Sequence, residues 1–184
     1  MSIVKRSAPT AFDGTVFRSR TEARWAVFFK TVGVPYEYEK YSFFFPYLTG
    51  QEDIGRSRYT PDFYLPEHHL WIEVKGFEPD MTELAKGYRL ARQTKEPVFF
   101  YVGFPNARGK QPSGILEVDS EKIVDNLSWG NIFEEGSQSG LLQGWFPFLN
   151  SEEDFWKGIE AGKKAFRAPP PKTKDWWKKP EDIK

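Results

Sequence analysis

Apolar and polar residues alternate through most of the stretch from Tyr59 to Gly76, which predicts two short strands joined by a tight turn. Successive strand residues point to opposite faces, so one face would be apolar and the other would carry the charged residues. The expected apolar face consists of Phe63, Leu65, Leu70, Ile72 and Val74, and the other face consists of Asp62, Tyr64, Trp71, Glu73 and Lys75. If the turn centres between Glu67 and His68, Asp62 lies directly opposite Glu73.

Two helices are predicted, one on either side of this hairpin. The first is expected over Arg18–Gly33, with Ser19 or Thr21 as its N-cap and Gly33 at its C-terminal end. The second is expected over Pro79–Lys95, with apolar residues on one side and basic residues on the other. The hairpin would therefore lie between two helices along the chain.

The remaining strands of this region are predicted from their aromatic and apolar runs. Tyr36–Phe45 predicts the first strand, and its run Phe43-Phe44-Phe45 is expected to be buried on both faces. Residues 46–58 are expected to form a loop. The apolar segment Pro97–Phe104 predicts an interior strand, parallel to its partner and reached by a right-handed crossover.

The pattern is weaker after Phe104. Further short strands are predicted at Ile115–Val118, Trp129–Phe133 and Gly144–Phe148. Ser151 is expected to begin a helix that continues to about Arg167. The resulting division is an N-terminal arm (1–16), a core (17–104), a small β-rich extension with a C-terminal helix packed on the core (105–167) and a Pro-, Lys- and Trp-containing tail (168–184).

Composition narrows the function classes. The 184 residues suffice for one domain, and the absence of cysteine excludes disulfides, thiolate metal sites and cysteine nucleophiles. The two histidines, His68 and His69, are adjacent, would point to opposite faces and are expected to be structural. No apolar run is long enough to span a membrane, so a soluble cytoplasmic protein is expected. The net charge of zero is unusual for a protein that binds duplex DNA.

The charged face of the hairpin is the candidate site. Opposed strand residues have Cβ atoms about 4.5–5.5 Å apart, and two carboxylates at that spacing repel each other unless a cation lies between them. Hard oxygen ligands suit Mg²⁺ or Mn²⁺, and Lys75 projects from the same face as Glu73. The alternative is that Glu73 and Lys75 occupy an ordinary solvated strand face. Pro61 favours a strand start or a bulge, which often re-aims side chains beside active sites.

The pair Pro61-Asp62, followed by Glu73-Val74-Lys75-Gly76, resembles the signature of the PD-(D/E)XK nuclease superfamily. The resemblance covers about residues 17–103 and is strongest to small stand-alone members, such as phage-type or resolvase-like endonucleases. It implies an α/β fold (α+β, mixed sheet) with a restriction-endonuclease-like αβββαβ core. Members usually carry a further acidic residue on a helix before the sheet, and Glu22 is the candidate here.

The resemblance also implies a set of roles. Glu22, Asp62 and Glu73 would hold Mg²⁺ or Mn²⁺, with the Val74 carbonyl as a further ligand, and Lys75 would help to position or activate the attacking water. Glu22 has an alternative explanation, because an acid in the first turn of a helix is favoured by the helix dipole. Candidate contacts to DNA phosphates are Arg18, Arg20, Arg24, Arg56, Arg58 and Lys86.

The function expected from these residues is a divalent-metal-dependent DNA endonuclease that hydrolyses phosphodiester bonds, with branched or flapped DNA as the leading substrate. A homodimer would be required to cut both arms of a junction. One alternative is a non-catalytic DNA-binding or assembly protein that keeps the nuclease scaffold. Another is an interaction module that binds a protein partner, or unpaired bases, through Trp176-Trp177 in the tail.

Overall fold

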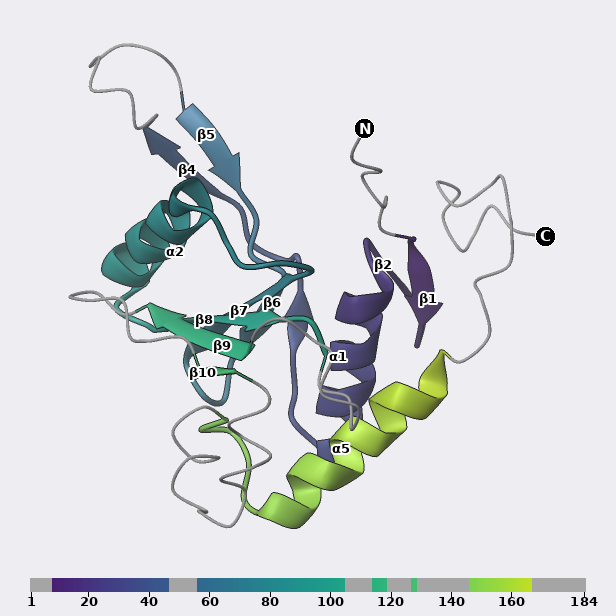
Figure 1. Cartoon of the computed structure of the whole chain (residues 1–184). Coiled ribbons are helices and arrows are strands. Elements are labelled where there is room, and N and C mark those ends of the chain that lie inside the picture. Colours follow the sequence, from purple (N-terminus) through teal and green to yellow (C-terminus); the bar gives the residue numbers. More distant parts are fainter. Residues whose placement is uncertain (1–7, 47–55, 105–113, 119–126, 129–145, 167–184) are drawn as a thin grey trace.

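A computed structural model describes residues 8–46, 56–104, 114–118, 127–128 and 146–166. In this part of the chain, a mixed six-stranded sheet with strand order β10-β9-β8-β7-β6-β3 lies between helices, and two two-stranded sheets accompany it (Figure 1). The helices are α1 (Arg20–Val32), α2 (Met81–Thr94) and α5 (Glu152–Ala165). The strands of the main sheet are β3 (Glu37–Tyr38), β6 (Phe63–Leu65), β7 (Leu70–Lys75), β8 (Val98–Val102), β9 (Gly114–Val118) and β10 (Leu127–Ser128). The α/β class with a mixed sheet is therefore present.

The central hairpin has the predicted register. Strands β6 and β7 pair antiparallel, with Phe63 opposite Ile72 and Leu65 opposite Leu70. This register extended by one residue sets Asp62 opposite Glu73, as the turn position required. The apolar face of the hairpin lies in the larger core, and its other face adjoins a smaller core that includes Trp71. Both the register and the division of the two faces are confirmed.

The helices cover opposite faces of the sheet. Helix α1 begins at its N-cap Ser19, whose side chain accepts the Glu22 N–H, and ends at Gly33 in the left-handed region. It packs with α5 on the larger core, where a Cβ atom at Gly158 would meet the Phe28 ring at 2.5 Å. The missing side chain of Gly158 therefore lets the two helices approach closely. Helix α2 packs on the smaller core on the other face.

The predicted crossover to an interior strand is confirmed in its main features. Helix α2 follows β7 directly, and a capping box formed by Asp80 and Glu83 begins it. Strand β8 then pairs parallel to β7 and lies between β7 and β9. Because β8 is covered on both faces, each of its residues is buried, as its continuous apolar run predicts.

The strand predicted over Tyr36–Phe45 is wrong as a single element. Strand β3 ends at Tyr38 and pairs with β6, whereas β4 (Phe43–Pro46) pairs with β5 (Arg56–Tyr59) in a separate ribbon. The physical break is at Glu39, whose φ of 45° turns the chain out of the extended conformation. The expected loop therefore ends earlier than predicted, because its last residues form β5.

Burial of the Phe43-Phe44-Phe45 run is also not as predicted. Phe45 is buried and Phe43 is half-buried, but Phe44 is 57% exposed. The reason is the topology, because this run lies in a two-stranded ribbon that is covered on one face only. A further hairpin of β1 (Thr10–Phe12) and β2 (Thr15–Phe17) extends from the predicted N-terminal arm into the first residue of the predicted core.

The C-terminal part is described only over residues 114–118, 127–128 and 146–166. Strand β9 and helix α5, with its N-cap Ser151, agree with the predictions. Within the predicted strand at Gly144–Phe148, the described residues instead form a turn, closed by the Leu149 N–H bonding to the Phe146 carbonyl. The predicted strand at 129–133 and the tail with Trp176-Trp177 lie outside the described residues. No described helix is both long enough and apolar enough to cross a membrane.

Candidate active site

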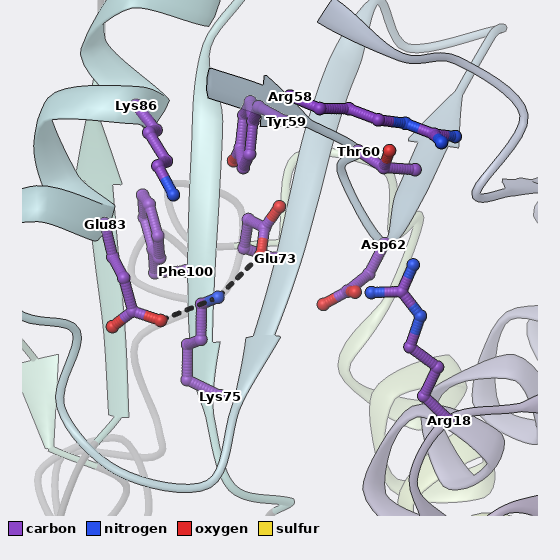
Figure 2. A pocket seen from close by; sticks show the side chains of 10 residues that line it. All are labelled: Arg18, Arg58, Tyr59, Thr60, Asp62, Glu73, Lys75, Glu83, Lys86 and Phe100. Atoms are coloured by element: carbon purple, nitrogen blue, oxygen red, sulfur yellow. Dashed lines mark ion pairs between the residues drawn. The ribbon is translucent and has the colours of Figure 1, made fainter. Parts of the chain in front are cut away.

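A cavity of about 410 Å³ opens between the β4–β5 ribbon, the β6–β7 hairpin and the start of α2. Figure 2 shows Glu73 and Lys75 between two groups of side chains, with Asp62 and Arg18 on one side and Glu83 and Lys86 on the other. The lining residues are Arg18, Arg58, Tyr59, Thr60, Asp62, Glu73, Lys75, Glu83, Lys86 and Phe100. The cavity therefore contains the three residues of the hairpin that were predicted as its site.

Asp62 is held where β6 begins. Its Oδ2 accepts the Val74 N–H at 2.7 Å, and its own carbonyl accepts the Glu39 N–H at 2.9 Å. The hairpin register sets Pro61 opposite Val74, so the Asp62 carboxylate satisfies the Val74 N–H at the point where the β6 ladder stops. Asp62 is only 8% exposed, which makes it a fixed, buried acid beside β7.

Glu73 and Lys75 occupy alternate positions on β7 and contact each other. Lys75 Nζ lies 2.9 Å from Glu73 Oε2 and 3.0 Å from Glu83 Oε1, so it bridges β7 and α2. Glu73 is 2% exposed, and its Oε1 atom makes no hydrogen bond to any described residue. These residues are therefore not a solvated strand face.

Burial dominates the electrostatics of the acids. It raises the pKa of Asp62 well above its usual range, and the charges of Glu73 and Glu22 raise that pKa further. Burial also raises the pKa of Glu73, although the Lys75 ammonium opposes this shift. Burial alone would lower the pKa of Lys75, but the nearby carboxylates, Glu73 first, outweigh it and raise that pKa. Lys75 therefore remains charged at neutral pH.

Glu22 lies beside the cavity without lining it. It is 6% exposed, and its Oε2 accepts the Tyr38 hydroxyl at 2.6 Å and the Arg18 N–H at 3.1 Å. Burial and the Glu22 carboxylate raise the pKa of Tyr38, so the phenol remains a donor. The charge of Glu22 contributes to the raised pKa of Asp62, so the acid of α1 acts electrostatically on the hairpin acids without joining them in one cluster.

The six candidate contacts to DNA divide into three that line the cavity, two that do not, and Arg56, whose side chain is not described. Three of them line the cavity: Arg18, Arg58 and Lys86. Arg18 also forms an ion pair with Glu39 at 2.6 Å. Arg20 and Arg24 do not reach the cavity lining, and burial and the charge of Arg20 lower the pKa of half-buried Arg24. Arg56 belongs to β5, but its side chain lies outside the described part of the structure.

Four lining residues were not predicted from the sequence, and one of them, Thr60, directly follows β5. Tyr59 comes from β5, and burial and the Glu73 carboxylate raise its pKa well above the usual range. Its hydroxyl lies close enough to the Glu73 carboxylate to lower the pKa of Glu73. Glu83 was identifiable as the third residue after the N-cap Asp80, but its contact with Lys75 depends on how α2 folds back. Phe100 comes from the interior strand β8, and no local pattern marks it.

A divalent cation fits the two buried carboxylates of the hairpin. Among the described residues, no three or more His, Asp or Glu side chains converge in a ready-made metal site. The fit therefore depends on Glu73 and Asp62, which are buried near each other. A cation bound between them would compensate the repulsion between the two carboxylates.

Comparisons with known proteins give no match to this chain. No family model matches it, and searches of curated proteins and of solved structures give none either. Its function must therefore be inferred from the residues and the geometry of the cavity.

Proposed function

We propose that this chain is a divalent-metal-dependent DNA endonuclease with a restriction-endonuclease-like core of the PD-(D/E)XK type. The observation that carries the proposal is the buried pair of Asp62 and Glu73 beside Lys75. Burying two carboxylates together is unfavourable unless something compensates their charge. Proteins keep such arrangements at functional sites more often than elsewhere.

Asp62 and Glu73 would hold Mg²⁺ or Mn²⁺, with Glu22 and the Val74 carbonyl as the further ligands that the superfamily resemblance implies. When bound, such a cation lowers the pKa of water and offsets the charge that develops on a phosphate. Asp62 reaches β7 through the Val74 N–H, which fixes one of its oxygens and leaves the other for a ligand. Tyr38 orients the Glu22 carboxylate by donating to Oε2.

Lys75 would act as a charged donor. Without metal, the nearby carboxylates raise its pKa, and Glu73 and Glu83 hold its Nζ between β7 and α2. A protonated lysine can donate to the attacking water or to a phosphate oxygen, but it cannot accept a proton. Arg18, Arg58 and Lys86 line the same cavity and would attract the phosphates of DNA to a site rich in acids.

A second candidate is a non-catalytic DNA-binding or assembly protein that keeps this scaffold. The observation that favours it is that Glu73 and Glu83 already neutralise Lys75. In such a protein, the buried ion pairs would support the fold and the basic rim of the cavity would bind DNA. The two candidates differ in whether any DNA is cut.

The decisive experiment is cleavage of linear, nicked, flapped and four-way DNA with Mg²⁺, with Mn²⁺ and with EDTA. The proteins are wild type, Asp62→Asn, Lys75→Met and the control Glu160→Gln, which removes an exposed acid of α5. Metal-dependent cutting by wild type and the control, lost in the other two, supports the proposal. Equal cutting by all four proteins contradicts the site, and binding without cutting favours the second candidate.

A further inference from the structure

The β4–β5 ribbon has one face turned to the core and one turned to solvent. Phe43, Phe45 and Tyr59 belong to the inner face, which packs against Trp71 and α2. Phe44 and Arg58 are direct partners in the ribbon register and belong to the outer face. Figure 1 shows the ribbon extending past α2, away from the main sheet. The outer face of the ribbon is therefore available to a ligand.

The outer face is continuous with the rim of the cavity. Arg58 donates from Nε and Nη2 to Ser42 Oγ at 3.1 Å and 2.9 Å, and Ser42 Oγ lies 2.9 Å from Thr60 Oγ1. These bonds hold the guanidinium along the outer face, and both Arg58 and Thr60 also line the cavity. A path along the molecule thus leads from the exposed ring of Phe44 to the Arg58 guanidinium and then to the candidate site.

We propose that the outer face of the β4–β5 ribbon binds an unpaired DNA strand that leads into the cavity, with a base stacked on Phe44 and a phosphate on Arg58. The inference deepens the proposed function and rests on it, because it names single-stranded or flapped DNA as the substrate class. Base–aromatic stacking needs an exposed ring and an unpaired base, since the bases of a duplex are already stacked.

Charge supports a single strand over a duplex. Binding of a duplex depends mainly on neutralising many phosphates, and this chain has a net charge of zero. An aromatic platform supplies affinity that does not depend on charge. The ribbon combines such a platform, Phe44, with one guanidinium, that of Arg58. This combination suits a strand whose bases are accessible, because binding then requires few contacts to phosphates.

The test is binding of fluorescein-labelled DNA by the full-length protein in EDTA, measured by anisotropy. The probes are a short single strand, a flapped duplex and a blunt duplex of the same sequence. Phe44→Ala is expected to weaken binding of the single strand about 5-fold to 100-fold, because stacking of one base is lost. Phe44→Trp is expected to retain binding, and Phe44→Leu to lose it, because leucine keeps apolar bulk without a ring.

Two further variants provide a control and a second test. Trp156→Ala removes a partly exposed aromatic ring from α5, outside the cavity lining, and is expected to bind the single strand as wild type does. Arg58→Ala is expected to weaken binding and to reduce the slope of log affinity against log salt by about 0.7, the contribution of one phosphate of a single strand.

Three results of the binding assay would overturn the inference. They are unchanged single-strand binding by Phe44→Ala, an equal loss on the blunt duplex, and retention of binding by Phe44→Leu. A change in oligomeric state without a change in DNA binding would also overturn it and would assign the face to an interface between copies. The proposed function is tested separately, because it fails if no metal supports cutting, even when the ribbon variants lose single-strand binding.

Discussion

The two faces of the main sheet close in different ways, although β7 contributes to both. On the α1 side, Ile72 and Val74 join a core of interlocking aromatic rings, including Trp25, which stacks on Tyr101 with ring centroids 4.6 Å apart. On the α2 side, Glu73 and Lys75 face a cavity. Burial there raises the pKa of both acids of the hairpin, Asp62 and Glu73. One face is optimised for packing, and the other keeps an unfavourable arrangement of charge that a ligand would relieve.

The largest expected effect concerns the packed face. Trp25→Ala removes a fully buried ring and the hydrogen bond from its Nε1 to the Gly103 carbonyl. The free energy of unfolding is expected to fall by about 3–5 kcal/mol, as for other buried aromatic truncations. Urea titration followed by circular dichroism measures the change. A loss below about 1 kcal/mol would show that this face is less tightly packed than its contacts indicate.

The second prediction concerns the cavity face. Lys75→Met keeps the length of the side chain but removes its charge, so DNA cleavage is expected to fall about 100-fold to 1,000-fold. The midpoint of thermal unfolding is also expected to fall, because the buried Glu73 carboxylate loses its Lys75 partner. Single-turnover cleavage and thermal melts separate the two effects. Loss of the fold in Lys75→Met would instead make this lysine part of the structural core.

The third prediction tests the link between α1 and the cavity. Tyr38→Phe removes the hydroxyl that donates to Glu22, so Mn²⁺ affinity is expected to fall about 10-fold to 100-fold, as when other hydrogen bonds to metal ligands are lost. Tyr64→Phe is the matched control, because its hydroxyl donates to Glu96 and is absent from the cavity lining. Titration calorimetry measures both. Equal Mn²⁺ affinities of the two variants would show that Glu22 is not a metal ligand.

The smallest expected effect is a gain of stability. Asn at position 62 can still accept the Val74 N–H but carries no charge, so metal-free Asp62→Asn is expected to be about 1 kcal/mol more stable than wild type at neutral pH. Folding raises the pKa of Asp62, so the folded chain prefers the protonated acid. The contribution of Asp62 to the free energy of unfolding is therefore fully present below about pH 4 and is lost as the pH rises through the folded-state pKa.

Denaturant titrations at several pH values in EDTA check this prediction. The advantage of Asp62→Asn over wild type should grow as the pH rises and then level off. The same variant should have lost cleavage, so the two measurements together would show stability exchanged for activity. An advantage that shrinks with rising pH would contradict the direction of the shift.

The elements predicted correctly are those that local sequence determines. The register of β6 and β7 follows from alternation and a short turn, and α1 follows from Ser19 and Gly33. The separate β4–β5 ribbon was missed, because the turn at Glu39 has no marker such as glycine in the sequence. A single positive φ therefore changed which sheet the second half of a predicted strand joined.

The acids and the lysine of the candidate site were predicted only where they belong to the β6–β7 hairpin. Asp62, Glu73 and Lys75 lie on paired strands, so their proximity follows from the register. Tyr59 and Glu83 come from a different sheet and from a helix, and their positions depend on packing across the smaller core. The burial of Glu73 was likewise not readable from alternation, which describes an exposed face equally well.

The β6–β7 turn also has a practical use. The Asp62–Val74 bond fastens the hairpin beside the cavity, whereas the turn at residues 66–69 lies at the opposite end of the strands, where Glu67 and His69 are exposed. Five strand residues at about 3.3 Å each place this turn roughly 15 Å from the acids. A fluorophore or a short peptide tag inserted there would report on the protein in cells while leaving its chemistry untouched.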